Sequence, residues 1–374
     1  MAIEERELET IDINVNVGPQ HPATHGVFRM ILRVDGELVV DLEPVIGYLH
    51  RGAEKLSENC DYRQAIAFQD RTEYLAQFNA ELCYVIAVEK LMGLEVPERA
   101  EYIRVILTEL NRIASHLMFM GAFSADLGVF GTLFMYAFRE RERMLDLFEE
   151  ISGDRMMYSY FRVGGLAWDV PEDFVERTRW MVKEARKGIA DIDGLLTENE
   201  VFLARTRGIG IMTAEQAIDW GFSGPMLRAS GVRHDLRRAE PYSIYDRLEF
   251  DIPIGHRGDV YDRYMVRLEE MRQSARIVEQ CLDQMPKDGP IVAPDLKRVL
   301  RPPAGEVYMR AENPRGEYGI YLVSKGADKP YRLKIRSPSF CHLAALRDMT
   351  IGHYLADAVL ILGSVDIVLC EVDR

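Results

Sequence analysis

PERAEYIRVILTELNRIASHL, residues 97–117, carries a clear helical pattern and indicates what kind of fold to expect. Its proline stands in a first helical turn, where a missing amide hydrogen is tolerated. Apolar side chains then recur every three or four residues, which is the spacing of one helix face: Ile103, Ile106, Leu107, Leu110, Ile113 and Leu117. The segment therefore predicts a long helix that buries one face in a helical body.

The segments around it extend this helical body and then end it. Similar periodicity predicts further helices over residues 71–92, 136–151, 171–196 and 260–285. Prolines and glycines from 286 to 303 predict an irregular connection. Strand-like segments follow at residues 307–311, 318–323 and 331–335, and a last helix over roughly 346–362 precedes an extended tail.

The start of the chain predicts a small antiparallel sheet. Ile11, Ile13, Val15 and Val17 alternate with polar residues, and Asp35-Gly36 forms a tight-turn signal between residues 27–34 and 37–42. The loop GPQHPATHG, residues 18–26, connects the first two strands and carries His21 and His25. Two imidazoles in a braced loop suit proton chemistry near neutral pH. On spacing alone, histidines that only satisfy backbone groups are the more ordinary interpretation.

These elements predict an α+β fold that is mainly α. We expect an N-terminal β region over residues 1–52 and a helical body over 53–285. An irregular connection with a β insertion would span 286–340, and a C-terminal helix and tail 341–374. The ends should pack on the helical body, giving one integrated domain overall.

Composition excludes several functional classes. A formal charge of −14 argues against a nucleic-acid-binding protein. No run of about 18 apolar residues predicts a membrane span, and the acidic start does not resemble a secretory signal. The chain has no C-x-x-C pair, which argues against a zinc or iron–sulfur site, and its cysteines are expected to be reduced thiols: Cys60, Cys83, Cys281, Cys341 and Cys370.

Several blocks of sequence resemble one known family. They are GPQHPATHG (18–26), LHRGAEK (49–55), DRTEY (70–74), RVILTELNRIASHLM (104–118), SADLG (124–128), FRERERM (138–144), SGPMLRASGV (223–232), GDVYDRYMVRLEEMRQS (258–274), PRGEYGIYLVS (314–324) and EVDR (371–374). Together they resemble the hydrogenase-like D-subunit family of NADH-quinone oxidoreductase, respiratory complex I. The resemblance covers nearly the whole chain, and it implies a helical body of the nickel–iron hydrogenase large-subunit type.

The kinship with hydrogenases implies a lost metal site. Hydrogenases hold nickel and iron with two cysteine pairs, and this chain has Glu73, Ala76, Val368 and Glu371 at those places. Soft metal chemistry of this kind needs thiolates. Cys370 is one residue away from a ligand place and is interpreted as a bystander. We therefore expect no metal in this chain.

The resemblance assigns roles to four residues in a quinone chamber. His25 matches the headgroup-binding histidine, Tyr74 its partner tyrosine, and Asp126 the carboxylate that pairs with His25. Met118 matches a wall residue, and methionine suits a flexible apolar lining. His25, Tyr74 and Asp126 would be catalytic. His25, Tyr74 and Met118 would bind quinone.

Taken singly, the same residues have more ordinary interpretations. Tyr74 would be a core tyrosine, Asp126 a loop or capping carboxylate, and His21 part of the loop structure. The remaining candidates are expected to be structural: Arg51, Asp70 and Arg71 as an ion-pair network, His116, His342 and His353 as packing residues, and FRERERM as a solvated or interfacial helix face with pairs four residues apart.

The resemblance also implies partners and a location. Quinone reduction would couple to proton pumping, in a protein that binds no cofactor of its own. FMN and the iron–sulfur clusters would belong to the partners, among them the small iron–sulfur B subunit, the C subunit and the membrane-arm H subunit. The chain would be peripheral, on the cytoplasmic side of the cell membrane. Ubiquinone and menaquinone both remain open, as does the electron donor. The alternatives are a hydrogenase large subunit of a membrane-bound complex and a purely structural adaptor between the two arms.

Overall fold

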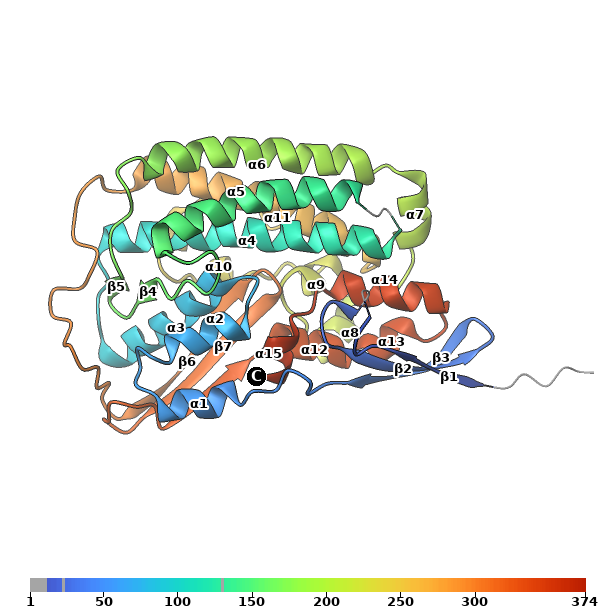
Figure 1. Cartoon of the computed structure of the whole chain (residues 1–374), viewed down its shortest axis with the longest axis horizontal. Helices are drawn as coiled ribbons and strands as arrows, with labels where there is room; N and C mark the ends of the chain where they lie inside the picture. The colour runs from blue at the N-terminus through green and yellow to red at the C-terminus, as the bar shows by residue number, and fades with distance from the viewer. Residues whose placement is uncertain (1–11, 22–23, 129–130) are drawn as a thin grey trace, which may run out of the picture.

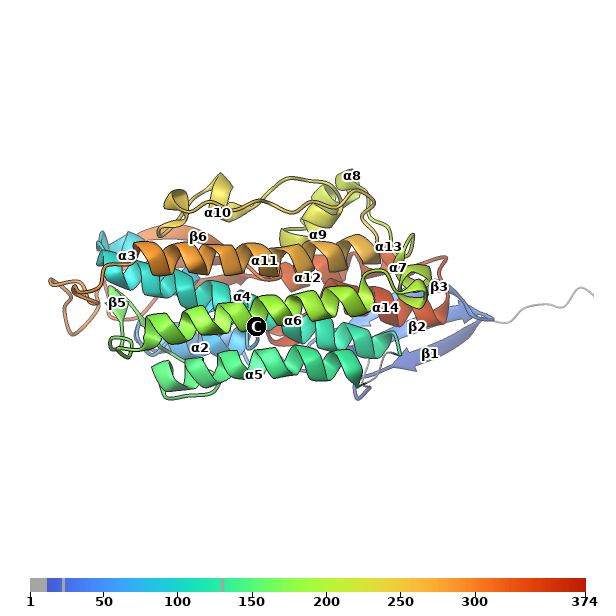
Figure 2. The ribbon, with the colours of Figure 1, turned by 90° about the horizontal axis from the view of Figure 1, so that it is seen from above.

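Four long helices form the body of the molecule. The computed structural model describes residues 12–21, 24–128 and 131–374. In it, α4 packs against α5 and α11, and α6 packs against the same two helices, which closes a bundle. Figure 2 shows α5, α6 and α11 running side by side. The bounds are Glu98–Asp126 for α4, Thr132–Ser152 for α5, Phe174–Leu196 for α6 and Val260–Gln284 for α11. All four predicted helices of the body are confirmed, with shifted ends.

The predicted helix over residues 71–92 is confirmed only from residue 77 onward, because the chain is interrupted at residues 73–76 and a separate helix precedes that break. Helix α2 covers Ile66–Thr72 and α3 covers Gln77–Met92. The backbone amide of Phe78 donates to Oδ1 of Asn111 at 3.1 Å, and the Asn111 Nδ2 donates to the carbonyl of Leu75 at 3.3 Å. Asn111 on α4 thus provides partners that a continuous helix would have supplied itself.

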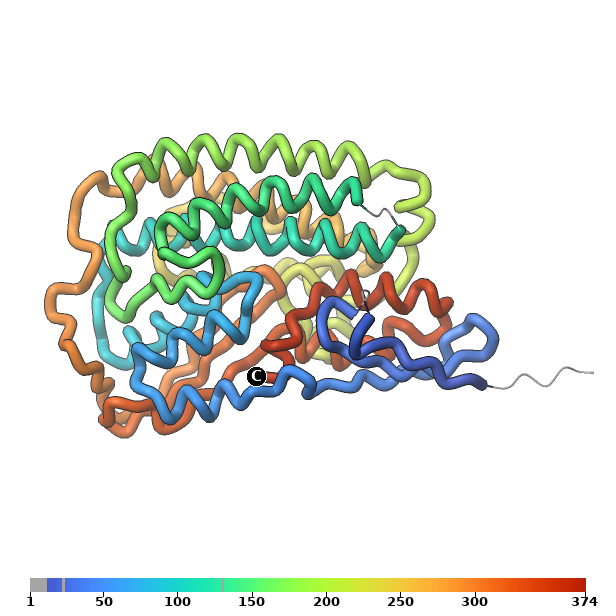
Figure 3. The backbone as a smooth tube through the Cα atoms, in the orientation of Figure 1, coloured from blue at the N-terminus to red at the C-terminus, as the bar shows by residue number. Residues whose placement is uncertain are grey.

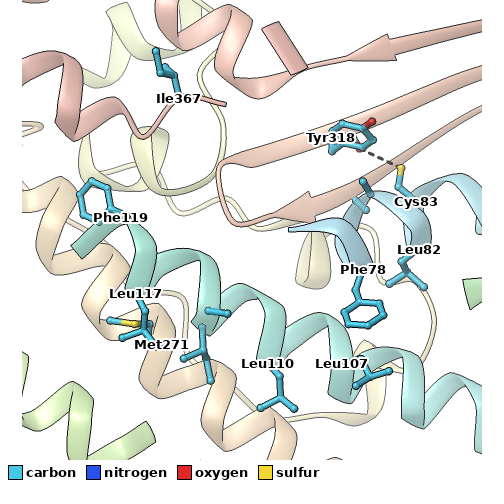
Figure 4. Close-up of a cluster of buried hydrophobic side chains, with 14 of the residues drawn as sticks. Phe78, Leu82, Cys83, Leu107, Leu110, Leu117, Phe119, Met271, Tyr318 and Ile367 are labelled. Carbon is cyan, nitrogen blue, oxygen red and sulfur yellow. Dashed lines mark hydrogen bonds between the residues drawn. The ribbon is translucent and has the colours of Figure 1, made fainter. Parts of the chain in front are cut away.

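The β insertion forms a sheet against the far side of α3. Strands β6 (Gly305–Asn313), β7 (Gly316–Ser324) and β8 (Arg332–Arg336) are antiparallel in the order β6-β7-β8. Helix α3 packs on β6 and β7. In Figure 4 the thiol of Cys83 on α3 points to the carbonyl oxygen of Tyr318 on β7, at 3.3 Å. The three predicted strands are confirmed; β6 and β7 are longer than expected, and β8 is shifted by one residue.

The N-terminal sheet lies against the C-terminal helices. Strands β1 (Ile13–Val17), β2 (Arg29–Asp35) and β3 (Leu38–Val45) are antiparallel in sequence order, and Gly36 and Glu37 form the predicted tight turn. Strand β3 contacts α13 and α14. In Figure 1 this sheet lies at one end of the molecule, below the bundle. The predicted strand residue Ile11 lies outside the described residues.

The C-terminal segment is more broken and more buried than the sequence indicates. A first helix, α12, covers Pro338–Ala344. The single helix expected over 346–362 is two helices, α13 (Leu346–Thr350) and α14 (Leu355–Val365). The tail, expected to be extended, contains a further short helix, α15 (Leu369–Asp373). Val39 of β3 exchanges backbone hydrogen bonds with Gly352 and His353, which breaks the helix there. Asp373 accepts from the amides of Gly47 and Leu49, so the chain end lies beside the segment after β3 (Figure 3).

A buried ionic network anchors the long connection between α6 and α11 to the bundle. Arg228 pairs with Glu270 on α11, and Arg237 pairs with Glu109 on α4. His116, expected to be a packing residue, belongs to this network, because its Nε2 lies 2.9 Å from Oε2 of Glu270. The connection contains α7 Glu200–Thr206, α8 Ala214–Asp219, α9 Gly224–Ala229, α10 Leu236–Ala239 and the 3-10 helix Tyr245–Arg247.

Two short strands complete the fold, Phe161–Arg162 and Gly165–Leu166, which form a hairpin between α5 and α6. Among the described residues, no helix is both long enough and apolar enough to span a membrane.

Candidate functional site

A cavity of about 510 Å³ opens where the N-terminal loop, the α2–α3 break, α4 and the C-terminal segment meet. Its volume lies within the usual range of small-molecule sites. The lining is mostly apolar, with a few polar groups: His21, His25, Gly26, Tyr74, Leu75, Met118, Phe119, Ala122, Ala125, Asp126, Phe134, Val359, Asp366 and Ile367. His25, Tyr74, Met118 and Asp126 therefore lie around one space, although they are far apart in the sequence.

A short polar contact between two side chains of this cavity joins His25 and Asp126. His25 lies in the β1–β2 loop with a φ of 50°, and Asp126 is the last residue of α4. The His25 Nε2 is 2.6 Å from Asp126 Oδ2, and their side chains are only 11% and 6% exposed. A charge-assisted hydrogen bond of this length between nearly buried groups is a strong one. The Asp126 carboxylate thus pairs with the His25 imidazole instead of capping the helix that it ends.

The pair keeps the imidazole in its charged form. Burial by itself would lower the pKa of His25, but the hydrogen bond and charge of Asp126, together with the charge of Asp366, raise this pKa above its ordinary value. His25 therefore holds its proton at a pH where an exposed histidine would begin to lose it. It can donate that proton to an acceptor in the cavity.

Gly363 on α14 leaves the room that the pair occupies. A Cβ atom on this glycine would lie 2.4 Å from Asp126 Oδ2 and 3.3 Å from His25 Nε2. Sequence reasoning missed this residue, since a glycine within the apolar run 356–369 carries no chemistry of its own. The only available signal was a glycine in a helix interior, which usually has a packing reason.

Tyr74 faces the cavity from the α2–α3 break. The Gln77 Nε2 donates to the carbonyl of Tyr74 at 2.5 Å, which fixes its backbone. Burial, followed by the charges of nearby groups beginning with Cys370, raises the pKa of Tyr74 far above its ordinary value. The phenol therefore stays protonated and can donate a hydrogen bond.

The resemblance implies that Glu73, Ala76, Val368 and Glu371 stand where hydrogenases carry their metal-binding cysteines, and the structure shows a different chemistry around these residues. The buried guanidinium of Arg315 lies 3.2 Å from Oε1 of Glu73 and 3.3 Å from Oδ1 of Asp366. Glu371 accepts from the backbone amide of Ser339 at 3.1 Å. An alanine, a valine and two carboxylates beside a fixed cation do not fit a nickel–iron centre. Within the described ranges, no group of three or more His, Cys, Asp or Glu side chains is arranged to hold a metal ion.

The predicted network of Arg51, Asp70 and Arg71 is wrong. Asp70 is buried and accepts hydrogen bonds from the backbone amide and hydroxyl of Ser159, at 2.9 and 2.8 Å. The Arg71 guanidinium donates to the carbonyl of Ala67 instead. Asp70 faces inward from α2, so an arginine on the outer face of that helix does not reach it.

The FRERERM segment is not simply a solvated face. Glu140 is buried against Gly188 of α6. It pairs with Arg143, which is three residues later and not the expected four, at 2.7 Å.

His342 and His353 have packing roles as expected. The Nε2 of His342 accepts a hydrogen bond from the backbone amide of Ser223, and the Nε2 of His353 accepts one from the backbone amide of Gly210. Cys370 is half-buried and lies outside the lining of the main cavity, beside a much smaller space lined by Arg51 and Arg71.

Comparison with known proteins identifies relatives along the whole chain. Residues 126–302 and 296–374 match the family described as the respiratory-chain NADH dehydrogenase 49 kDa subunit. Proteins named as the D subunit of NADH-quinone oxidoreductase are similar over nearly their entire length. The one from Carboxydothermus hydrogenoformans is 52% identical over 98% of this chain and 100% of its own. The one from Dehalococcoides mccartyi is 53% identical over 98% of this chain and 100% of its own length. The one from Chlorobaculum parvum is 51% identical over 99% of this chain and 94% of its own length.

Proposed function

The chain belongs to the family of the respiratory-chain NADH dehydrogenase 49 kDa subunit, the D-subunit family of NADH-quinone oxidoreductase, and we propose that its cavity is the inner end of a quinone-reduction chamber. One observation carries the proposal. His25, Tyr74, Met118 and Asp126 line the same mostly apolar cavity, and two of them carry protons that they can donate. An apolar space with a few convergent polar groups suits a flat ring with two carbonyl oxygens.

The chemistry asked of this chain is proton donation. A quinone becomes a quinol when it receives two electrons and two protons. The electrons come from an iron–sulfur cluster in a partner protein of the complex. The His25 imidazolium and the Tyr74 phenol hydrogen-bond the two carbonyl oxygens and supply protons as charge develops there. Met118 and Phe119 form an apolar wall that excludes water.

The His25–Asp126 pair also offers a first step toward proton pumping. When His25 gives up its proton, Asp126 loses the positive charge that it faces at 2.6 Å. An uncompensated carboxylate that is only 6% exposed is unfavourable. The Asp126 carboxylate therefore turns toward another cation, and this movement transmits the reduction event to the proton-pumping membrane arm.

The family membership makes the other proteins of complex I the partners of this chain. We infer that the small iron–sulfur B subunit closes the chamber, and that the C subunit and the membrane-arm H subunit adjoin it. FMN and the iron–sulfur clusters belong to such partners. The chain is then a peripheral component on the cytoplasmic side of the cell membrane.

Substitution at the two donors tests the function in the assembled complex. We expect His25→Ala and Tyr74→Phe each to lower the quinone reductase rate about a hundredfold, while NADH oxidation with an artificial electron acceptor is unchanged. His256→Ala and Tyr354→Phe change exposed residues of the same types and serve as controls. A structural adaptor would retain near-normal quinone reductase rates in all four variants, provided that the complex assembles.

A further inference from the structure

Two pairs of buried acidic side chains flank the α2–α3 break that carries Tyr74. Glu73 faces Glu371 of α15, and Asp70 of α2 faces Glu81 of α3. All four residues are fully buried. The resemblance had placed Glu73 and Glu371 at two of the hydrogenase cysteine places, but the sequence did not indicate that either pair of carboxyl groups is in contact, because the partners come from different elements.

In the first pair, each carboxyl group has one oxygen with a donor and one without. Glu73 Oε1 is 3.2 Å from Arg315 Nη1, and Glu371 Oε1 accepts from the Ser339 amide at 3.1 Å. The other oxygen of each, Oε2, is buried and has no donor in the described part of the chain. The two carboxyl groups nevertheless lie within hydrogen-bonding reach of each other. Two acceptors form such a bond only when a proton lies between them.

The second pair repeats this arrangement independently. Asp70 Oδ2 accepts from Ser159, and Glu81 Oε2 accepts from the amide of Phe161 at 2.8 Å. Asp70 Oδ1 and Glu81 Oε1 are the buried oxygens left without a donor, and these side chains also lie within hydrogen-bonding reach of each other. In both pairs, each carboxyl group therefore has one oxygen with a hydrogen-bond donor and one buried oxygen without a donor.

We propose that each pair shares a single proton, and that the two acid–carboxylate hydrogen bonds fix the α2–α3 connection and hold Tyr74 at the cavity wall. Like charges in close contact in a dry site cannot both be ionised, so one proton is retained by the pair as a whole. Glu73, Glu371, Asp70 and Glu81 are then positioning residues for Tyr74. That last consequence rests on the proposed function, whereas the sharing of the protons does not.

The charges around the first pair agree with one shared proton. Arg315 faces both Glu73 and Asp366, and Arg267 Nε lies 3.9 Å from Asp366 Oδ2. The His25 imidazolium also faces Asp366, and it pairs with Asp126. Three positive groups thus face the four carboxyl groups of Glu73, Glu371, Asp366 and Asp126, and one proton in the pair balances them. Tyr318 on β7 and Cys370 on α15 are also near and remain neutral, since burial raises the pKa of each. Burial likewise raises the pKa values of Glu73 and Glu371.

The second pair has fewer cations near it. Arg71 and Arg162 contribute positive charge, but neither forms a close ion pair with Asp70 or Glu81 within the described residues. Tyr158 lies close by, and burial keeps its phenol neutral. Burial is therefore the main reason that this pair keeps its proton.

A glutamine in place of one glutamate tests the idea sharply. In Glu371→Gln the amide oxygen still accepts from Ser339, and the amide nitrogen donates to Glu73 without needing a shared proton. Glu371→Leu removes both contacts. We expect Glu371→Gln to keep the wild-type KM for quinone at neutral pH and Glu371→Leu to raise it about tenfold. A Glu371→Gln complex as impaired as Glu371→Leu would overturn the positioning role.

Infrared spectroscopy of the assembled complex reads the shared proton directly. A carboxyl group that keeps its proton absorbs as a carboxylic acid at neutral pH, unlike an exposed glutamate. The difference spectrum between wild type and Glu371→Gln should show the loss of one carboxylic-acid carbonyl band, and Glu81→Gln should show the same. The exposed control Glu198→Gln should show loss of a carboxylate band only.

The outcomes separate the two proposals. If neither Glu371→Gln nor Glu81→Gln removes a carboxylic-acid band, the shared protons do not exist. If the bands are lost but His25→Ala leaves quinone reduction unchanged, the proton sharing stands and the proposed function fails.

Discussion

At the scale of single residues, the pairing of His25 with Asp126 determines the electrostatics of the cavity. The 2.6 Å contact joins the β1–β2 loop to the end of α4, and it holds the imidazole charged in surroundings that would otherwise discharge it. A raised histidine pKa means that the charged form persists as pH rises and is lost only when the pH passes that higher pKa.

Asp126→Asn should shift this titration to lower pH. The substitution keeps the shape of the side chain and removes the charge that opposes burial, so the pKa of His25 falls. We expect the quinone reductase rate of the assembled complex to begin its alkaline decline at least about one pH unit earlier than in wild type. Asp154→Asn, at an exposed position, is the matched control. Identical pH profiles in wild type and Asp126→Asn would contradict the role of the pair.

Gly363→Ala should disrupt the same pair without changing any titratable group. Its Cβ would lie 2.4 Å from Asp126 Oδ2, so the carboxylate must move away from His25. We expect an early alkaline decline like that of Asp126→Asn, and a loss of about 1–3 kcal/mol in the free energy of unfolding from overpacking. Gly194→Ala on α6 is the control, because its Cβ would meet nothing within 4 Å. That control should be neutral or stabilising.

At the scale of elements, the sequence predicts helices well and their interruptions poorly. The apolar period of residues 71–92 continues across the α2–α3 break, so periodicity alone indicates one helix. The break depends on Asn111, which is distant in sequence and supplies hydrogen-bond partners to Phe78 and Leu75. The break between α13 and α14 has a similar cause, since β3 pairs with the backbone there. Contacts between segments that are distant in the sequence therefore determine where both helix breaks occur.

Asn111→Ala should therefore destabilise the α2–α3 break. The buried amide of Phe78 loses its acceptor, and the carbonyl of Leu75 loses a donor. An unsatisfied buried group costs about 1–3 kcal/mol. Chemical denaturation of the full chain should show this loss, whereas Asn59→Ala, at an exposed position, should change stability by less than about 0.5 kcal/mol. An equal effect of the two substitutions would mean that Asn111 does not maintain the break.

At the scale of the whole molecule, the cavity exists because the two ends of the chain meet at the bundle. His25 comes from the N-terminal loop, Asp366 from the C-terminal segment, Tyr74 from the α2–α3 break and Asp126 from the end of α4. Fold class and the three β segments near the C-terminus follow from local patterns in the sequence. The grouping of the site residues does not, and only the family resemblance pointed to it. The role of Gly363 and the contacts within the buried acidic pairs appear only in three dimensions, because they depend on which side chains lie opposite one another.

The ionic network that anchors the α6–α11 connection should determine how the molecule unfolds in acid. Burial opposes ionisation of Glu109, but Arg112 and Arg237, with hydrogen bonds from Ser274 and Tyr245, lower its pKa to about 2. A carboxyl group with a lowered folded-state pKa contributes stability that is present above its unfolded pKa, near 4.3. That contribution is lost as the pH falls toward about 2.

Glu109→Gln leaves buried arginines without their counter-charge and should destabilise the chain by about 3–5 kcal/mol at neutral pH. Its stability should also depend less steeply on pH between these values, measured by circular dichroism during acid titration, with Glu198→Gln following wild type. If Glu109→Gln and wild type lose stability with the same slope, the acid sensitivity originates in other carboxyl groups and not in this network.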